Sequence, residues 1–181
     1  MTESNAVKTG GCQCGAIRFR VEGALGNASI CHCRMCQKAF GGFYAPLVAI
    51  ERPQLTWTRG EPAQFRSSNH VTRGFCPSCG TPLTYEEPGD KLALAIGAFD
   101  HPEEIAPKIQ FGVEAKLPYV DTVSALPERD TMDDLEAASF LATIRSNQHP
   151  DRETESWPPD EWPQDAWSNA PSHLPRNPGK A

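Results

Sequence analysis

The seven cysteines of this chain fall into three short clusters, and cysteine thiolates at such spacings are typical metal ligands. The clusters are Cys12-Gln-Cys14, Cys31-His-Cys33-Arg-Met-Cys36 and Cys76-Pro-Ser-Cys79. A C-x-C or C-x-x-C pair can turn two sulfurs toward one ion. Zinc takes four ligands in a closed structural site and commonly three in a catalytic site. Two pairs and one triplet therefore predict one zinc site of each kind.

The two pairs predict the closed, structural site, whose ligands would be Cys12, Cys14, Cys76 and Cys79. A glycine follows each pair, at Gly15 and Gly80. Glycine permits the positive φ that lets backbone N–H groups point at the sulfurs. A structural zinc of this kind contributes on the order of 10 kcal/mol to folding. We therefore expect the domain to fail to fold without metal.

The triplet predicts a catalytic site with Cys31, Cys33 and Cys36 as metal ligands and catalytic residues. Three thiolates and Zn²⁺ carry a net charge of −1 and leave one coordination position for a substrate. A thiol that binds there would be deprotonated by the metal. This arrangement is suited to chemistry on the sulfur of a small thiol.

Side chains interleaved with the triplet are predicted to bind the substrate. Arg34 and Lys38 would offset the negative charge and hold an anionic substrate, and Gln37 would hydrogen-bond to it. The alternative is a second structural zinc completed by a fourth ligand, for which His32 and His70 are the candidates. Because His32 lies between two ligands, we expect its ring to point away from the metal.

The elements that must position these cysteines are expected to be short β-strands. Short segments of alternating apolar and polar residues, or of apolar residues alone, are separated by turn residues. This pattern predicts an all-β domain of zinc-stabilised antiparallel sheets with metal knuckles at the turns. Pro46 within one run suggests an edge strand or a bulge. The predicted strands are 17–21, 43–50, 55–57, 64–66, 83–85, 92–96 and 109–113.

The C-terminal third differs in composition from the rest. Thr131 and Asp134 resemble a helix start, and Ala137, Phe140, Leu141 and Ile144 would line one face of a short helix. Beyond it, Trp157, Trp162 and Trp167 lie among prolines and acids in a largely irregular tail. These tryptophans are expected to dock onto the domain or onto a partner subunit in a homo-oligomer. The predicted units are a zinc-binding β domain (1–127), a helix (128–148) and a Pro/Trp-rich acidic tail (149–181).

Composition and charge narrow the class of protein. Residues 1–127 hold 12 acidic and 12 basic side chains, so the net charge of −6 comes from the C-terminal third. Without a basic excess, nucleic acid is not expected as a partner. No stretch approaches the roughly 20 apolar residues of a membrane span, and no signal-type segment opens the chain. Clustered cysteines in odd number favour metal binding in a reducing compartment, so we expect a cytoplasmic protein.

The three cysteine clusters, in this order, resemble a known family. Gly11-Cys-Gln-Cys-Gly15, Cys31-His-Cys-Arg-Met-Cys-Gln-Lys38 followed by Gly41-Gly42, and Arg73-Gly-Phe-Cys-Pro-Ser-Cys-Gly80 are similar to the glutathione-dependent formaldehyde-activating enzyme family, which includes centromere protein V. The similarity runs from about residue 8 to 127. Two features depart from the family pattern, namely Gln110-Phe111-Gly112 in place of a histidine-led strand and Pro118-Tyr119 in place of Pro-Trp.

The resemblance implies both the metal sites and the activity. It implies zinc-held antiparallel sheets, a closed site from the first and last pairs, and an open site from the triplet. It also implies a carbon–sulfur lyase that adds glutathione to formaldehyde reversibly, giving S-hydroxymethylglutathione. We therefore expect a zinc-dependent lyase acting on an adduct of a small thiol such as glutathione. The alternative is a non-catalytic, zinc-stabilised β module that binds a protein partner through its surface or its tail.

Overall fold

The computed structural model describes residues 7–129 and 144–159, and most of the described chain is short strands. A single α-helix, α1 (Arg34–Phe40), lies among the described residues, together with five 3₁₀ turns: η1 (Arg52–Gln54), η2 (Ile96–Ala98), η3 (Pro102–Glu104), η4 (Val113–Ala115) and η5 (Val120–Ala125). The strands are β1 (Lys8–Gly11), β2 (Arg18–Val21), β3 (Ala28–Cys31), β4 (Ala45–Glu51), β5 (Leu55–Arg59), β6 (Ala63–Arg66), β7 (Thr72–Phe75), β8 (Pro82–Glu86), β9 (Lys91–Ala95) and β10 (Ile109–Phe111).

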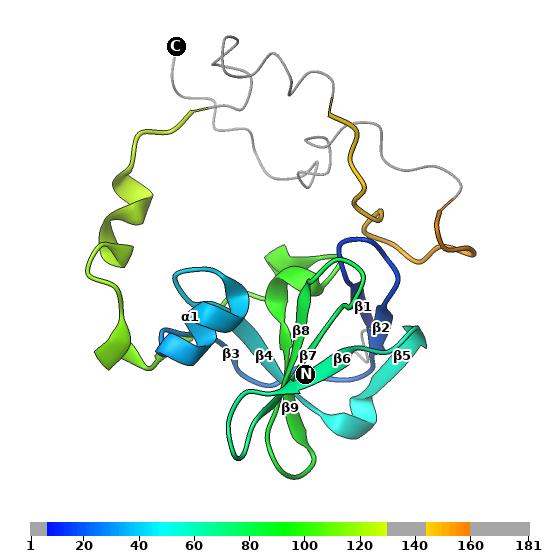
Figure 1. Cartoon of the computed structure of the whole chain (residues 1–181), viewed down its shortest axis with the longest axis horizontal. Helices are drawn as coiled ribbons and strands as arrows, with labels where there is room; N and C mark the ends of the chain where they lie inside the picture. Colours follow the sequence, from blue (N-terminus) through cyan, green and yellow to red (C-terminus); the bar gives the residue numbers. More distant parts are fainter. Residues whose placement is uncertain (1–6, 130–143, 160–181) are drawn as a thin grey trace, which may run out of the picture.

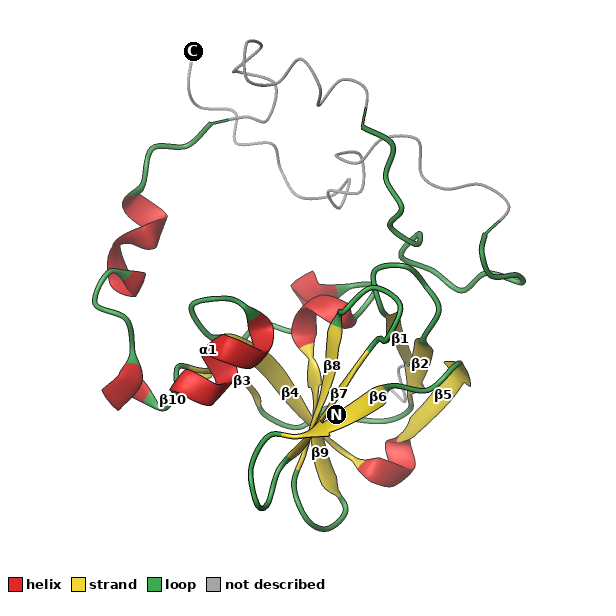
Figure 2. Ribbon diagram, in the orientation of Figure 1, coloured by secondary structure: helices red, strands yellow, loops and turns green. Residues whose placement is uncertain are grey.

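The strands form two sheets, as Figures 1 and 2 show. One sheet has the order β1-β2-β5, and the other has the order β10-β3-β4-β9-β8-β7-β6. Every strand pair is antiparallel except β10 with β3, which is parallel. The predicted fold class, zinc-compatible antiparallel β-sheets with cysteine knuckles, is confirmed. The parallel pair was not predicted.

The main hydrophobic core brings the two sheets together around Phe19 of β2, which is fully buried. Its ring meets the rings of Trp57 and Phe99 edge-on, with centroids 6.0 and 5.1 Å away. A Cβ built at Gly10 would lie 2.4 Å from the end of the Phe19 ring. Gly10 therefore lets β1 pass directly over this ring, and the aromatic cluster fixes the three-stranded sheet against the larger one.

The expectation that Pro46 marks an edge strand or bulge is wrong, because β4 lies inside the large sheet between β3 and β9. Pro46 pairs with Ile30 of β3, whereas pairing with β9 begins one residue later, at Leu47. At the start of β4, Ala45 and Pro46 pair with β3 on one side and have no paired residue in β9 on the other. The proline can be accommodated there because no hydrogen bond from its nitrogen is needed.

The predicted C-terminal helix lies largely in residues 130–143, outside the described residues. The described parts of the predicted helix 128–148, which are residues 128, 129 and 144–148, are not helical. The chain is described again at 144–159, where it has no regular secondary structure. In Figure 1 this segment (orange) passes beside the β1–β2 end of the domain. Among the described residues, no helix has the length and apolar character needed to cross a membrane.

Candidate metal centres and substrate cavity

The first and last cysteine pairs come together into one four-sulfur group, as predicted. Cys12 and Cys14 lie in the β1–β2 turn, Cys76 and Cys79 lie in the β7–β8 turn, and all four sulfurs lie within 4.8 Å of one another. The Sγ atoms of Cys14 and Cys76 are 3.9 Å apart. Gly15 and Gly80 have φ of 75° and 82°, the left-handed conformation expected after a knuckle. This donor set can hold a tetrahedral metal ion such as zinc.

The surroundings of this group act on its thiols in opposite directions. Burial raises the pKa of Cys12, although the Ile17 N–H donates to its sulfur at 3.3 Å. Burial also acts to raise the pKa of Cys79, but hydrogen bonds from the Thr81 side chain and backbone outweigh it and lower this pKa to about 6. Metal binding must therefore displace a proton that burial holds on Cys12, whereas Cys79 loses its proton more readily.

The triplet forms a second, separate sulfur group. Cys31 ends β3, Cys33 is the N-cap residue of α1, Cys36 lies in the first turn of this helix, and their sulfurs lie within 4.8 Å of one another. The Cys36 N–H donates to Cys33 Sγ at 3.4 Å. Although burial opposes it, this backbone contact helps to lower the pKa of Cys33. The donor set suits a metal ion held by three thiolates, one ligand fewer than a closed zinc site takes.

The two histidines considered as fourth ligands lie elsewhere. Within the described residues, the metal-competent group contains the three cysteines but neither His32 nor His70. The His32 side chain is fully buried, and its Nε2 is 3.0 Å from the side-chain oxygen of Gln110. His32 thus has Gln110 as its side-chain contact and is not part of the metal-competent group. Its contact with Gln110 joins the ligand loop to β10.

A cavity of about 420 Å³ opens beside the three-cysteine group. Its wall includes all three of these cysteines but none of the other four. The exposed surface of the wall is mostly apolar, although six of the twelve other lining residues are polar or ionisable: Asn27, Ser29, Met35, Leu47, Ala49, Ser67, Val71, Arg73, Tyr85, Glu87, Ala93 and Phe111. A small molecule in this cavity can therefore reach the sulfurs while contacting a largely apolar wall.

Arg73, the first residue of the motif around Cys76 and Cys79, contacts the three-cysteine group, and no site role was predicted for it. It is 3% exposed, and its Nη2 donates to Cys36 Sγ at 3.2 Å. This contact opposes burial, the main influence, which raises the pKa of Cys36 to about 12. A C-x-x-C motif gives no signal for such a contact, because Arg73 and Cys36 are brought together by the path of β7 beside α1.

The three residues predicted to bind substrate lie on α1, but none of them lines the cavity. Gln37 is buried, and its amide nitrogen donates to the carbonyls of His32 and Ala115 at 2.7 and 3.0 Å. The Arg34 guanidinium donates to the Gln37 side-chain oxygen at 3.0 Å. The polar atoms of Gln37 are thus engaged in holding the ligand loop, which leaves Arg34 and Lys38 as the residues with exposed charge.

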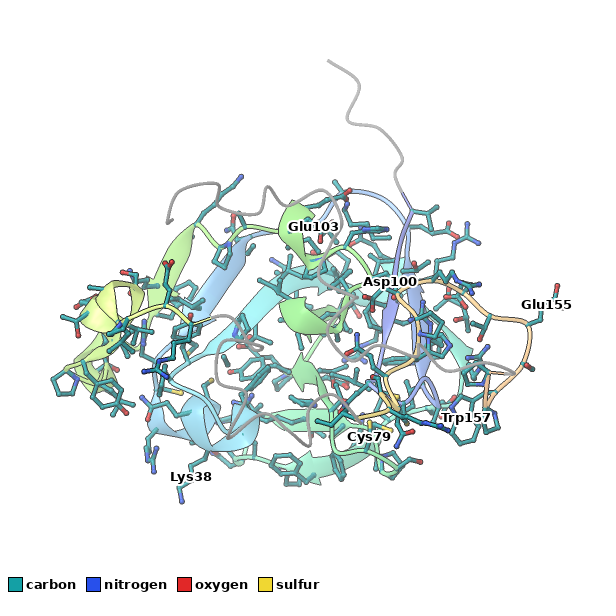
Figure 3. All side chains as sticks on the ribbon, turned by 90° about the horizontal axis from the view of Figure 1, so that it is seen from above. Lys38, Cys79, Asp100, Glu103, Glu155 and Trp157 are labelled. Carbon is teal, nitrogen blue, oxygen red and sulfur yellow. The ribbon has the colours of Figure 1, made fainter. Side chains whose placement is uncertain are left out.

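Arg34 and Lys38 border a neighbouring hollow of about 340 Å³. Figure 3 shows Lys38 at the outer side of α1, pointing away from the domain. The hollow shares Met35 and Ser67 with the cavity of the three cysteines. The two spaces are therefore adjacent, and the exposed charges lie beyond the cavity wall rather than inside it.

Residues 148–157, here called the strap, lie against the loop that carries Cys12 and Cys14. The His149 N–H donates to the Gln13 carbonyl at 2.6 Å, and the Trp157 Nε1–H donates to the Cys14 carbonyl at 2.6 Å. The Arg59 guanidinium donates to the Thr154 carbonyl at 2.5 Å. Trp157 and Cys79 lie on the same side of the domain in Figure 3. The tail thus docks onto the domain through Trp157, while Trp162 and Trp167 lie outside the described residues.

Comparison with known proteins gives one family. The model of the glutathione-dependent formaldehyde-activating enzyme family matches residues 7–115, which is more than half of the 181-residue chain. The match includes both cysteine groups and ends before the strap. No curated protein matches the chain.

Proposed function

Because this chain belongs to the glutathione-dependent formaldehyde-activating enzyme family, we propose that it is a zinc-dependent carbon–sulfur lyase. Its reaction would be the formation or breakdown of a small-thiol adduct such as S-hydroxymethylglutathione. The observation that carries this proposal is the position of the three-cysteine group, which lies in the wall of a 420 Å³ cavity. The four-cysteine group has no part in that wall, which suits a structural role.

The residues present fit zinc in both places. Seven free thiols lie in one group of four and one group of three, and a buried guanidinium contacts the smaller group. Zinc held by Cys31, Cys33 and Cys36 would supply a Lewis acid that favours the thiolate form of a bound thiol. Free thiols in this number also support a reducing compartment, and we place the activity in the cytoplasm.

The proposed reaction makes and breaks one carbon–sulfur bond. In the forward direction the thiol sulfur bonds to the carbonyl carbon, the C=O electron pair moves to the oxygen, and this oxygen takes up a proton while the thiol loses one. Burial, and then the Glu87 carboxylate, raises the pKa of Tyr85 to about 12. The Tyr85 hydroxyl, in the cavity wall, directs its one proton toward Glu87, so it would have to turn from this carboxylate to donate a hydrogen bond to the adduct oxygen.

The adjacent hollow would hold the charged part of the thiol. The cavity is mostly apolar, whereas glutathione carries carboxylates that need cationic or polar partners. Arg34 and Lys38 lie just beyond Met35 and Ser67, which border both spaces. A thiol with its sulfur at the three cysteines can extend across Met35 and place a carboxylate beside these exposed cations. This arrangement supports an anionic small thiol as the substrate.

Cobalt substitution tests the proposal. With cobalt in the three-cysteine site, added glutathione should change the thiolate-to-metal absorption band, and Cys33→Ser should abolish this response. Lys38→Gln should weaken glutathione binding without affecting a neutral thiol such as 2-mercaptoethanol. Lys91→Gln, which removes an exposed lysine from β9, is the matched control and should change neither. A folded, cobalt-loaded protein that gives no spectral response to any small thiol would refute the lyase proposal and favour the protein-binding module.

A further inference from the structure

Arg73 lies at the centre of a fixed set of contacts beside the three-cysteine group. It belongs to β7, where it pairs with Phe65 on one side and Tyr85 on the other. Its Nη2 donates to Cys36 Sγ at 3.2 Å, and its Nε donates to Ser67 Oγ at 3.0 Å. The guanidinium also lies 4.8 Å from the centroid of the Tyr85 ring. Its position is therefore set by β8, by the β6–β7 turn and by the cysteine itself.

The charge of Arg73 has an unusual environment. An arginine keeps its positive charge in proteins, and a buried charge is costly unless an anion compensates it. Within the described residues, no carboxylate lies within ion-pair distance of Arg73, and its Nη1 is buried without a hydrogen-bond partner. Arg18, which among the described arginines has a similarly buried side chain, has Asp100 at 2.6 Å and Glu153 at 3.2 Å.

The contacts of Arg73 leave one group that can serve as its counter-ion. Ser67 and Tyr85 contact it as neutral groups, whereas Cys36 presents a sulfur that can be a thiolate. Cys36 in turn lies within 4.8 Å of the sulfurs of Cys31 and Cys33. The buried cation and the three sulfurs therefore form one contact group, and thiolates produced there by metal binding would compensate the guanidinium.

We propose that Arg73 is a positioning residue that holds Cys36 and neutralises charge at the three-cysteine site, so that the site accepts an anionic sulfur. The part of this inference that concerns substrate binding rests on the proposed function, whereas the part that concerns metal affinity does not. Three thiolates and a divalent ion leave one negative charge, and a substrate thiolate would add a second. Arg73 reduces that charge by one from a buried position, where water screens little. Arg34 and Lys38 are exposed, so their effect at the sulfurs is weaker.

The test uses full-length protein with zinc kept in the four-cysteine site and cobalt titrated into the other. Arg73→Met removes the charge at similar length, Arg73→Lys keeps it, and Arg66→Met is the control on neighbouring β6. In Arg73→Met, cobalt affinity against a chelator should fall by about 10- to 100-fold, as for other residues that contact metal ligands. Glutathione affinity, read from the absorption band, should fall by about 10-fold or more. Arg73→Lys should recover most of both, and Arg66→Met should lose neither.

The outcomes separate this inference from the proposed function. If neither the parent nor any variant changes its absorption band when thiols are added, the lyase proposal fails. The cobalt affinities of the parent and the variants still test the role of Arg73. An Arg73→Met protein that binds cobalt with the affinity and the spectrum of the parent would overturn the inference. If Arg73→Met does not fold, Arg73→Gln supplies the same loss of charge with a donor retained. Failure of both neutral variants to fold, even with metal supplied, would make Arg73 a purely structural residue and would also overturn it.

Discussion

Replacing Asp100 by asparagine should destabilise the domain more than any surface change, because Asp100 neutralises a buried arginine. The Arg18 Nη1 and Nη2 atoms lie 2.8 and 2.6 Å from the two Asp100 oxygens, and both side chains are 3% exposed. The Thr9 hydroxyl donates to the same carboxylate at 2.5 Å. These contacts join β1 and β2 to the loop after η2, and so support the turn that carries Cys12 and Cys14.

The expected loss of stability depends on the anionic partners that Arg18 retains in the Asp100→Asn protein. Arg18 would keep its charge and retain only Glu153, at 3.2 Å and with a side chain 46% exposed, as an anionic partner. Removing one partner of a buried ion pair costs about 3–5 kcal/mol. At this chain length, such a loss lowers the thermal midpoint by about 6–20 °C. The measurement is thermal unfolding of the zinc-loaded protein, followed by circular dichroism.

Two further variants make the result specific to the buried pair. Glu153→Gln removes the half-exposed partner and should cost less than about 1 kcal/mol, since exposed ion pairs contribute little. The double variant Arg18→Met with Asp100→Leu removes both charges and should regain much of the stability lost in Asp100→Asn. An Asp100→Asn protein within about 1 kcal/mol of the parent, or no more affected than Glu153→Gln, would refute the reasoning.

Three other predictions concern the metal groups and the strap. Cys79→Ser should stay unfolded, as judged by circular dichroism, at zinc concentrations at which Cys33→Ser folds. The reason is that Cys79 belongs to the four-cysteine group, which joins two distant turns, whereas Cys33 belongs to the three-cysteine group. Equal folding of the two variants would contradict the assignment of a structural role to the four-cysteine group. Trp157→Phe removes the donor to the Cys14 carbonyl, so zinc release to a chromogenic chelator should quicken by about 2- to 10-fold, and an unchanged rate would mean that the strap does not retain the metal. Burial, and next the charge of Arg18, lowers the pKa of His149 below its ordinary value of about 6.5. Below this pH the unfolded chain binds more protons than the folded one. The free energy of unfolding should therefore be highest above about pH 7 and should fall as the pH drops below about 6.5. Thermal midpoints across this range should show a smaller fall in His149→Gln, and identical profiles would exclude the His149 contribution.

The cysteine partition and much of the sheet could be predicted because their signals are local. Ligand spacing and the following glycines at 15 and 80 identify knuckles wherever they fold. The alternation around Phe19 and the apolar run around Leu94 identify strands for the same reason. In each case a few adjacent residues carry the whole pattern, so the prediction needs no knowledge of which strands become neighbours.

Features that depend on pairing could not be predicted from local patterns. Helix α1 has only seven residues and begins at a metal-ligand loop, so it is too short for a helical period to show. The parallel pairing of β10 with β3 joins segments about 80 residues apart. The contact of Arg73 with Cys36 depends on where β7 lies relative to α1. Gln37 was expected at the substrate, but its position in α1 makes it a support for the ligand loop.

The four-cysteine group has a consequence for the supply of active protein in the cell. It ties a turn near the start of the chain to one some 60 residues later, and these turns belong to different sheets. If this group holds zinc as proposed, a nascent chain that lacks the ion would lose this tie between its two sheets and would expose its aromatic core to proteases more often. Abundance would then follow zinc availability with no dedicated sensor, since metal-starved chains would be degraded rather than stored.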